Sequence, residues 1–198
     1  MKALHTFCLF SALVAFIFGL TSCGGGPSAD DKTTYAFVTN GVDPFWTIAE
    51  RGVKAAAADL GVHANVLMPA AGAVEQKSML EDLLTRGTTG IAVSPIDSAN
   101  QTDFLNMVAE HTILITQDSD APESNRLVYV GMDNYDAGRA CGALVKEALP
   151  EGGEIMILIG RIEQENARRR RQGVIDEVLG RSHDPTRFDA PRSHNEGG

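Results

Sequence analysis

The residues best suited to recognition chemistry lie in one turn, where an apolar run ends and Asp43-Pro44-Phe45-Trp46 follows. Two adjacent aromatic rings can cover the C–H surface of a sugar ring, and the neighbouring carboxylate can accept hydrogen bonds from its hydroxyls. The same residues also suit a helix start, because Asp caps helices, Pro favours the first turn, and both aromatic side chains can pack into a core. Taken alone, the turn leaves both interpretations open.

The elements around this turn alternate between short apolar runs and amphipathic segments. The predicted strands cover residues 35–39, 65–68, 91–94, 113–116, 127–131 and 154–159, and the predicted helices cover 45–60, 74–86, 100–110, 135–149 and 165–179. Strands that alternate with helices and are apolar throughout predict an α/β fold, a doubly wound parallel sheet covered by helices on both faces. Ligands bind such sheets beyond the carboxyl ends of the strands, so the turns there supply the candidate site.

The N-terminal segment predicts where the protein works. A positive start at Lys2 precedes an apolar run over residues 7–20, which is too short to span a bilayer and is typical of a signal peptide. Leu20-Thr21-Ser22-Cys23 resembles a bacterial lipobox, in which the cysteine is lipidated. We therefore expect a lipoprotein signal peptide at 1–22, a lipid on Cys23 and a flexible linker at 23–33. This places the protein in the periplasm or cell envelope, anchored to an inner or an outer membrane.

Charge and motif content exclude several function classes. The net charge of −9 and the pI near 5.0 argue against nucleic acid, and acidic neighbours offset the arginine run at 168–171. No Gly-x-Gly-x-x-Gly, Gly-x-Ser-x-Gly or metal-ligand spacing of histidines occurs. We therefore expect no enzyme, no catalytic residue, no cofactor and no metal. Cys141 is left without a disulfide partner and is expected to be a buried helix residue.

Five segments in order give a specific resemblance. They begin at Thr39-Asn40-Gly41, Leu84-Thr85-Arg86, Ile91-Ala92-Val93, Ile115-Thr116-Gln117 and Val130-Gly131-Met132. Together they resemble the ribose-binding type of periplasmic sugar-binding protein, of the type I periplasmic-binding-protein fold. The resemblance implies a monomeric receptor whose two lobes close on one monosaccharide, a ribose-like pentose or a hexose, and then dock on the permease of an ABC importer. The alternative is a sugar or signal sensor of the same fold, feeding a membrane kinase or a lac-repressor-type regulator.

The resemblance also assigns roles in the first lobe. It places Phe45 and Trp46 against the sugar ring, with Asp43 facing hydroxyls. Asp118 matches a carboxylate that accepts sugar hydroxyl bonds, although a turn or cap role stays open. Ser94 stands where ribose receptors have Asn and can reach a hydroxyl or close the turn.

Further roles concern the crossing between lobes and the second lobe. Met132 marks the crossing and is expected to shape the pocket. Asn166 is expected to add a hydrogen bond at the start of a helix. Arg170, three residues before Gly173, matches an arginine that reaches the sugar across the cleft, and we favour it over Arg171. Ser119 stands where some relatives have Arg, which puts ribose itself in doubt.

The domain organisation follows from the same resemblance. We expect an N-terminal sugar-binding lobe at 34–132, the start of a C-terminal lobe at 133–180, and a disordered or aberrant tail at 181–198, where apolar periodicity is lost. The family requires further residues to complete the second lobe. The sequence thus predicts a truncated member with a partial second lobe, exposed apolar helix faces and impaired binding.

Overall fold

A computed structural model describes residues 33–191, and its core is a five-stranded parallel sheet in the order β2-β1-β3-β4-β5. The strands are β1 (Thr34–Val38), β2 (His63–Leu67), β3 (Gly90–Val93), β4 (Ile113–Gln117) and β5 (Tyr129–Val130). The helices are α2 (Pro44–Leu60), α3 (Ala73–Thr85), α4 (Ser98–His111), α5 (Asn134–Ala148) and α6 (Glu165–Val178). The α/β fold with a parallel sheet is therefore confirmed.

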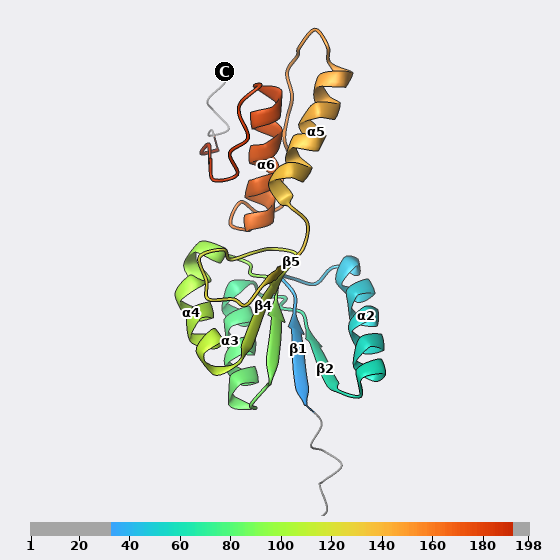
Figure 1. The fold of residues 1–198 in the computed structure, drawn as a ribbon, viewed down its shortest axis with the longest axis vertical. Coiled ribbons are helices and arrows are strands. Elements are labelled where there is room, and N and C mark those ends of the chain that lie inside the picture. The colour runs from blue at the N-terminus through green and yellow to red at the C-terminus, as the bar shows by residue number, and fades with distance from the viewer. Residues whose placement is uncertain (1–32, 192–198) are drawn as a thin grey trace, which may run out of the picture. The chain divides into compact units, whose positions relative to one another are not determined.

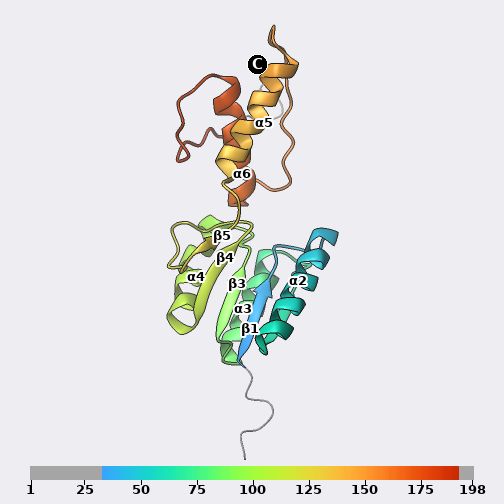
Figure 2. The ribbon, with the colours of Figure 1, turned by 45° about the vertical axis from the view of Figure 1, so that its right-hand side comes forward.

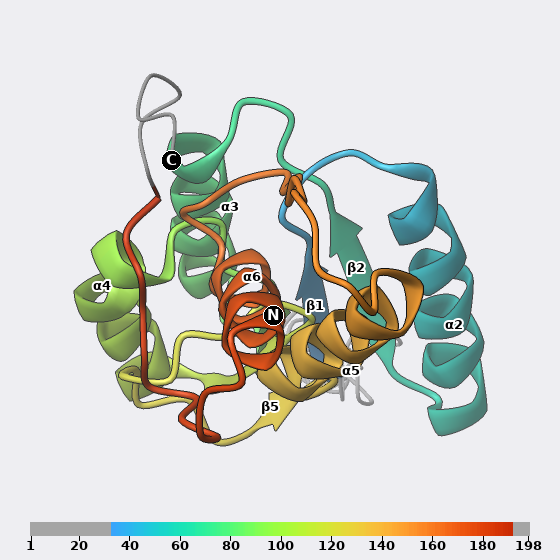
Figure 3. The ribbon, with the colours of Figure 1, turned by 90° about the horizontal axis from the view of Figure 1, so that it is seen from above.

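The sheet is covered by helices on both faces. Figures 1 and 3 show α2 on one face and α3 with α4 on the other. The central strands are apolar on both sides for this reason, and Val38 and Val93 are fully buried against Leu80 of α3 and Leu105 of α4. The register pairs Val38 with Val93, so the strands β1 and β3 end level with each other.

Helix α2 begins as its sequence signals predict. The Asp43 carboxylate accepts a hydrogen bond from the Phe45 backbone N–H at 2.8 Å, and Pro44 occupies the first helical position. Gly61 ends the helix in the left-handed conformation, with φ of 66°. The helix-start interpretation of the turn is thus confirmed for Asp43 and Pro44.

Helices α5 and α6 pack against each other through glycines. A Cβ atom on Gly138 would collide with the Arg170 carbonyl oxygen, and one on Gly173 would collide with the Tyr135 carbonyl oxygen. Only a residue without a side chain allows the two backbones to approach so closely, which explains why Gly138 follows the crossing motif and Gly173 follows the arginine run.

The predicted strand at residues 154–159 is wrong, because these residues form no strand. A strand requires a neighbouring strand, and the five strands of the described sheet do not include one beside this segment. Cys141 on α5 is exposed rather than buried. Cys141 lines a pocket together with Ile157, Leu158 and Ile159, so the two incorrect predictions concern neighbouring residues.

Residues 181–191 form no helix or strand, yet hydrogen bonds and ion pairs hold them to α5 and α6. The fully buried Asp176 carboxylate accepts hydrogen bonds from Tyr135, Gln172, Arg181 and Arg187. Arg181 also forms an ion pair with Asp189. The part of the expected tail that the structure describes is therefore attached at a buried carboxylate.

Within residues 33–191, none of the helices has the length and apolar character needed to cross a bilayer. The predicted signal peptide and Cys23 lie outside the described residues, and so does most of the predicted linker.

Candidate functional site

Asp118 is the centre of a polar cluster at the carboxyl ends of the strands. It follows β4 directly and has a φ of 60°, a left-handed conformation that Asp tolerates better than most residues. Its Oδ2 accepts hydrogen bonds from Asn40 Nδ2, Ser94 Oγ and Asn166 Nδ2, each at 3.2 Å. Three separate segments of the chain thus meet on one carboxylate oxygen.

The other carboxylate oxygen of Asp118 is free to bind something else. Within residues 33–191, no hydrogen bond or ion pair reaches Oδ1. Burial raises the pKa of Asp118 above its ordinary value, while hydrogen bonds from Ser94 and Asn40 and the positive charge of Arg170 oppose that rise. The cluster therefore holds a partly desolvated carboxylate with one unused acceptor.

Trp46 and Phe45 occupy different environments although they are adjacent. The Trp46 side chain is 4% exposed and packs edge-on against Phe37, with ring centroids 6.0 Å apart. The Phe45 ring is 58% exposed and meets Trp46 edge-on at 4.9 Å. Of these two rings, Phe45 is the one that offers free surface to a ligand. Trp46 acts on the polar cluster through a hydrogen bond from its Nε1 to Asn40 Oδ1, at 3.1 Å.

Ser94 lies beneath the cluster. It is fully buried, and its hydroxyl accepts a hydrogen bond from Asn40 Nδ2 at 3.0 Å besides donating to Asp118. The backbone N–H of Ser119 also donates to it, at 3.3 Å. With every direction of its hydroxyl occupied, Ser94 orients Asn40 and Asp118.

Arg170 lies at the end of a short chain of hydrogen bonds. Its Nη1 donates to Asn134 Oδ1 at 2.5 Å, and Asn134 Nδ2 donates to the Tyr129 hydroxyl at 3.2 Å. That hydroxyl in turn donates to the backbone carbonyl of Asp118 at 2.8 Å. Arg171 instead donates to the carbonyl of Asp189. The two arginines therefore face different partners, and Arg170 is the one whose charge acts on Asp118.

Asn166 carries a second unused acceptor. Its side chain is 4% exposed, and within the described residues its Oδ1 has no hydrogen-bond partner. A buried amide oxygen without a partner is costly, so it is a natural place for a hydroxyl donor from a ligand. Ser119 Oγ, in the same turn as Asp118, is also buried and has no hydrogen-bond partner among residues 33–191.

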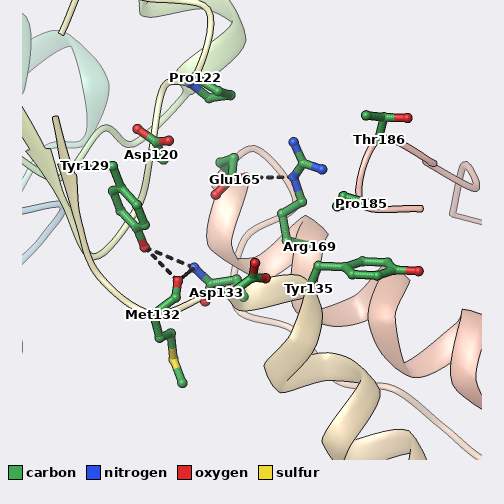
Figure 4. Close-up of a pocket in the computed structure, with 11 residues that line it drawn as sticks. Asp120, Pro122, Tyr129, Met132, Asp133, Tyr135, Glu165, Arg169, Pro185 and Thr186 are labelled. Carbon is green, nitrogen blue, oxygen red and sulfur yellow. Dashed lines mark hydrogen bonds and ion pairs between the residues drawn. The ribbon is translucent and has the colours of Figure 1, made fainter. Parts of the chain in front are cut away.

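Met132 lies apart from this cluster. It is 58% exposed and lines a pocket of about 270 Å³ with Asp120, Glu165 and Arg169 (Figure 4). Of the sequence-predicted site residues, only Met132 lines this pocket. Three carboxylates line the pocket: Asp120 pairs with Arg126, Glu165 pairs with Arg169, and Asp133 caps α5 by accepting a hydrogen bond from the Asp136 backbone N–H. The Asp118 cluster instead holds Asn166 Oδ1, which is buried and has no partner among residues 33–191, so recognition chemistry is assigned there.

The structure thus brings together Trp46, Ser94, Asp118 and Asn166, with Phe45 beside them and Arg170 linked through Asn134. It leaves Asp43 as a helix cap and Met132 in a neighbouring pocket. Sequence reasoning did not select Asn40, Tyr129 or Asn134. Asn40 and Asn134 stand in turns predicted at the carboxyl ends of strands, and this position was the available signal. Tyr129 lies within a predicted strand and gave none.

An open parallel sheet with polar side chains converging at its carboxyl edge defines the binding lobe of an α/β ligand-binding protein. The family model for the periplasmic binding protein domain matches residues 35–191, so the chain belongs to that family. The ribose import binding protein RbsB of Escherichia coli K12 is 26% identical over 144 residues, covering 72% of this chain and 49% of that protein.

Solved structures give the same result. A solute-binding protein of an ABC transporter from Burkholderia graminis, in complex with D-arabinose, has a TM-score of 0.72 and 27% identity, covering 78% of this chain and 54% of that one. The glucose-galactose binding protein GanP from Geobacillus stearothermophilus has a TM-score of 0.71 and 28% identity, covering 75% and 54%. The chain spans about half the length of the curated relatives it matches.

Proposed function

We propose that this chain carries the recognition lobe of a monosaccharide receptor that serves an ABC importer. The ligand is a ribose-like pentose or a hexose, held by the Asp118 carboxylate and covered by the Phe45 ring. Family membership and the relatives named ribose import binding protein and arabinose-bound solute-binding protein support this proposal. The permease of the importer is the expected protein partner.

The observation that carries the proposal is the pair of unused acceptors at one edge of the sheet. Asp118 Oδ1 and Asn166 Oδ1 belong to side chains that a single hydrogen bond joins at 3.2 Å. Sugars present neighbouring hydroxyl groups that donate hydrogen bonds, whereas an anionic ligand would be repelled by the carboxylate. An uncharged polyol with adjacent hydroxyls is therefore the ligand class that best fits the cluster.

The lipid anchor remains part of the proposal. Cys23 ends a lipobox-like sequence, and a lipid there would anchor the receptor to the inner or the outer membrane. Metabolic labelling with palmitate tests this: label that persists after Cys23→Ser contradicts the anchor.

Isothermal titration of the chain with D-ribose, D-arabinose, D-allose and D-galactose tests the binding function. We expect heat and thermal stabilisation with at least one of them, and Asp118→Asn should weaken binding about 10- to 100-fold, the usual worth of a charged hydrogen bond. Asp59→Asn, an equally conservative change on the exposed side of α2, is the control. Equal binding by the two variants would remove Asp118 from the site, and no binding of any sugar would refute the function for this chain.

A further inference from the structure

Helix α3 presents a buried glutamine to the ends of β1 and β3. Figure 2 shows α3 behind these two strands. The buried residues of the helix are Leu80 and Leu83, which belong to the apolar core, and Gln76, which is fully buried in the first turn. A buried amide costs free energy unless its hydrogen bonds are made, and an apolar residue would pack α3 onto the sheet without that cost. The amide of Gln76 therefore has a purpose other than packing.

Both N–H bonds of the Gln76 amide tie together the ends of two strands. Its Nε2 donates to the backbone carbonyl of Thr39, which follows β1, and to that of Ser94, which follows β3, each at 2.8 Å. These carbonyls lie just beyond the last paired residues of β1 and β3. Because Thr39 directly precedes Asn40, the tie acts on the backbone beside the two side chains, Asn40 and Ser94, that donate to Asp118 Oδ2.

A second buried glutamine fixes the orientation of the first. Gln101 of α4 is 7% exposed and donates from its Nε2 to Gln76 Oε1 at 2.9 Å. The Oε1 atom of Gln101 accepts from the backbone N–H groups of Ile96 and Asp97, at 3.0 and 2.9 Å. The neighbours of Gln76 Oε1 are thus donors and those of its Nε2 are acceptors, so the amide has one satisfied orientation. A network of buried amides holds the strand ends in place.

We propose that Gln76 is a positioning residue of the sugar site. It holds the ends of β1 and β3 at the spacing that lets Asn40 and Ser94 reach one carboxylate oxygen, at 3.2 Å each. A change in this spacing weakens those bonds, because hydrogen bonds depend steeply on distance and angle, and it leaves the Asp118 carboxylate less well oriented for a ligand. The effect on sugar affinity rests on the proposed function, whereas the effect on the carboxylate exists without a ligand.

The first test needs no sugar. Burial raises the pKa of Asp118, and hydrogen bonds from Ser94 and Asn40 oppose that rise. Gln76→Met removes both donors and keeps an uncharged side chain of similar length, so these bonds should loosen and the pKa of Asp118 should rise further. Carbon-13 NMR titration of the side-chain carboxyl groups in the full chain measures this shift, and Asp118→Asn assigns the signal.

The control for this titration is Leu80→Ala. Leu80 lies one turn further along α3 and packs in the apolar core, so its truncation loosens the helix without removing an amide of the network. This variant should lose stability and keep the parental pKa of Asp118. The other groups that act on the carboxylate, Arg170 of α6 and Tyr129 of β5, belong to different elements and are unchanged in both variants.

Calorimetric titration with D-ribose, D-arabinose, D-allose and D-galactose gives the second readout. For a sugar that the parent binds, Gln76→Met should raise the dissociation constant about 3- to 30-fold at unchanged stoichiometry. Leu80→Ala should lower the fraction of binding-competent chain and leave the dissociation constant of that fraction unchanged. A glutamine that served only the fold would behave like Leu80, so the two quantities separate positioning from stability.

The outcomes distinguish this inference from the proposed function. A parent that binds none of the sugars refutes the proposed function, and the NMR titration then decides alone whether Gln76 sets the Asp118 carboxylate. A parental pKa or a parental dissociation constant in Gln76→Met overturns the positioning role, and so does an equal shift in Leu80→Ala. If Gln76→Met fails to fold, Gln76→Asn replaces it: its amide is one methylene short of the two carbonyls, and it should shift both quantities in the same direction.

Discussion

Trp46 donates a hydrogen bond from its indole Nε1 to Asn40 Oδ1 at 3.1 Å, and this bond sets the direction of the Asn40 amide. With Oδ1 turned toward the indole, Nδ2 faces Ser94 and Asp118, where it donates at 3.0 and 3.2 Å. The buried aromatic residue thus acts on the carboxylate through an intervening amide. Asn40 is a positioning residue in this arrangement, and Phe45 is the ring left free for ligand.

Replacing Trp46 by Phe should separate these two roles. The aromatic packing is largely kept, but the donor to Asn40 is lost, so we expect sugar affinity to fall about 2- to 12-fold and the free energy of unfolding to fall by about 1 kcal/mol. Titration calorimetry and urea denaturation measure the two effects. Phe45→Ala, at an exposed ring, should weaken binding while changing stability by less than about 0.5 kcal/mol. If Trp46→Phe binds as tightly as the parent, the indole does not position the site.

The sequence predicted those features that depend on residues close together in the chain, and it missed those that depend on tertiary contacts. Helices and central strands came from apolar periodicity, and Asp43, Pro44 and Gly61 act locally, so their roles were predictable. The cluster was predictable only as a sheet edge, because Asn40, Ser94 and Asn166 meet through tertiary contacts that no local pattern encodes. The strand predicted at residues 154–159 was wrong, because strand formation depends on a neighbouring strand as well as on composition.

Asp176→Asn should destabilise the α5–α6 pair strongly. Asp176 is fully buried and its carboxylate forms ion pairs with Arg181 and Arg187, so its neutralisation removes from each arginine its one fully buried counter-charge. We expect a loss of about 3 kcal/mol in urea denaturation and faster proteolysis within residues 181–191. Asp82→Asn, at a surface ion pair with Arg86, should cost less than about 1 kcal/mol. Equal losses in the two variants would contradict the role of Asp176 as an anchor.

Gly131→Ala should disturb the crossing between β5 and α5. A Cβ atom at this position would collide with the outer end of the Tyr129 side chain, with its ring carbons as well as with the hydroxyl that joins Asn134 to the Asp118 carbonyl. We expect a cost of about 1–3 kcal/mol in the parent and a smaller cost in a Tyr129→Leu background, where both the ring and its hydroxyl are absent. Urea denaturation of the four proteins in this cycle gives the coupling energy. Additive costs would show that the collision is relieved elsewhere.

The pH dependence of Asp118 should have opposite signs for stability and for binding. Burial raises the pKa of Asp118 in the folded protein above its ordinary value, so between these two values the folded chain binds more protons than the unfolded chain. The Asp118 contribution to stability therefore falls as pH rises through that window. Sugar binding uses the ionised acceptor and should be lost as pH falls through the raised pKa.

Asp118→Asn tests both signs at once. The amide cannot ionise, so at neutral pH the variant should lose affinity for sugar while gaining stability or keeping it, as expected where a functional site holds a desolvated charge. Urea denaturation and calorimetric titration across mildly acidic pH measure the two curves. Asp176, whose pKa is lowered by hydrogen bonds and Arg187 despite its burial, supplies the internal contrast, because its contribution to stability is lost as pH falls. A stability curve for Asp118→Asn that runs parallel to that of the parent would show that the Asp118 carboxylate carries no desolvation cost.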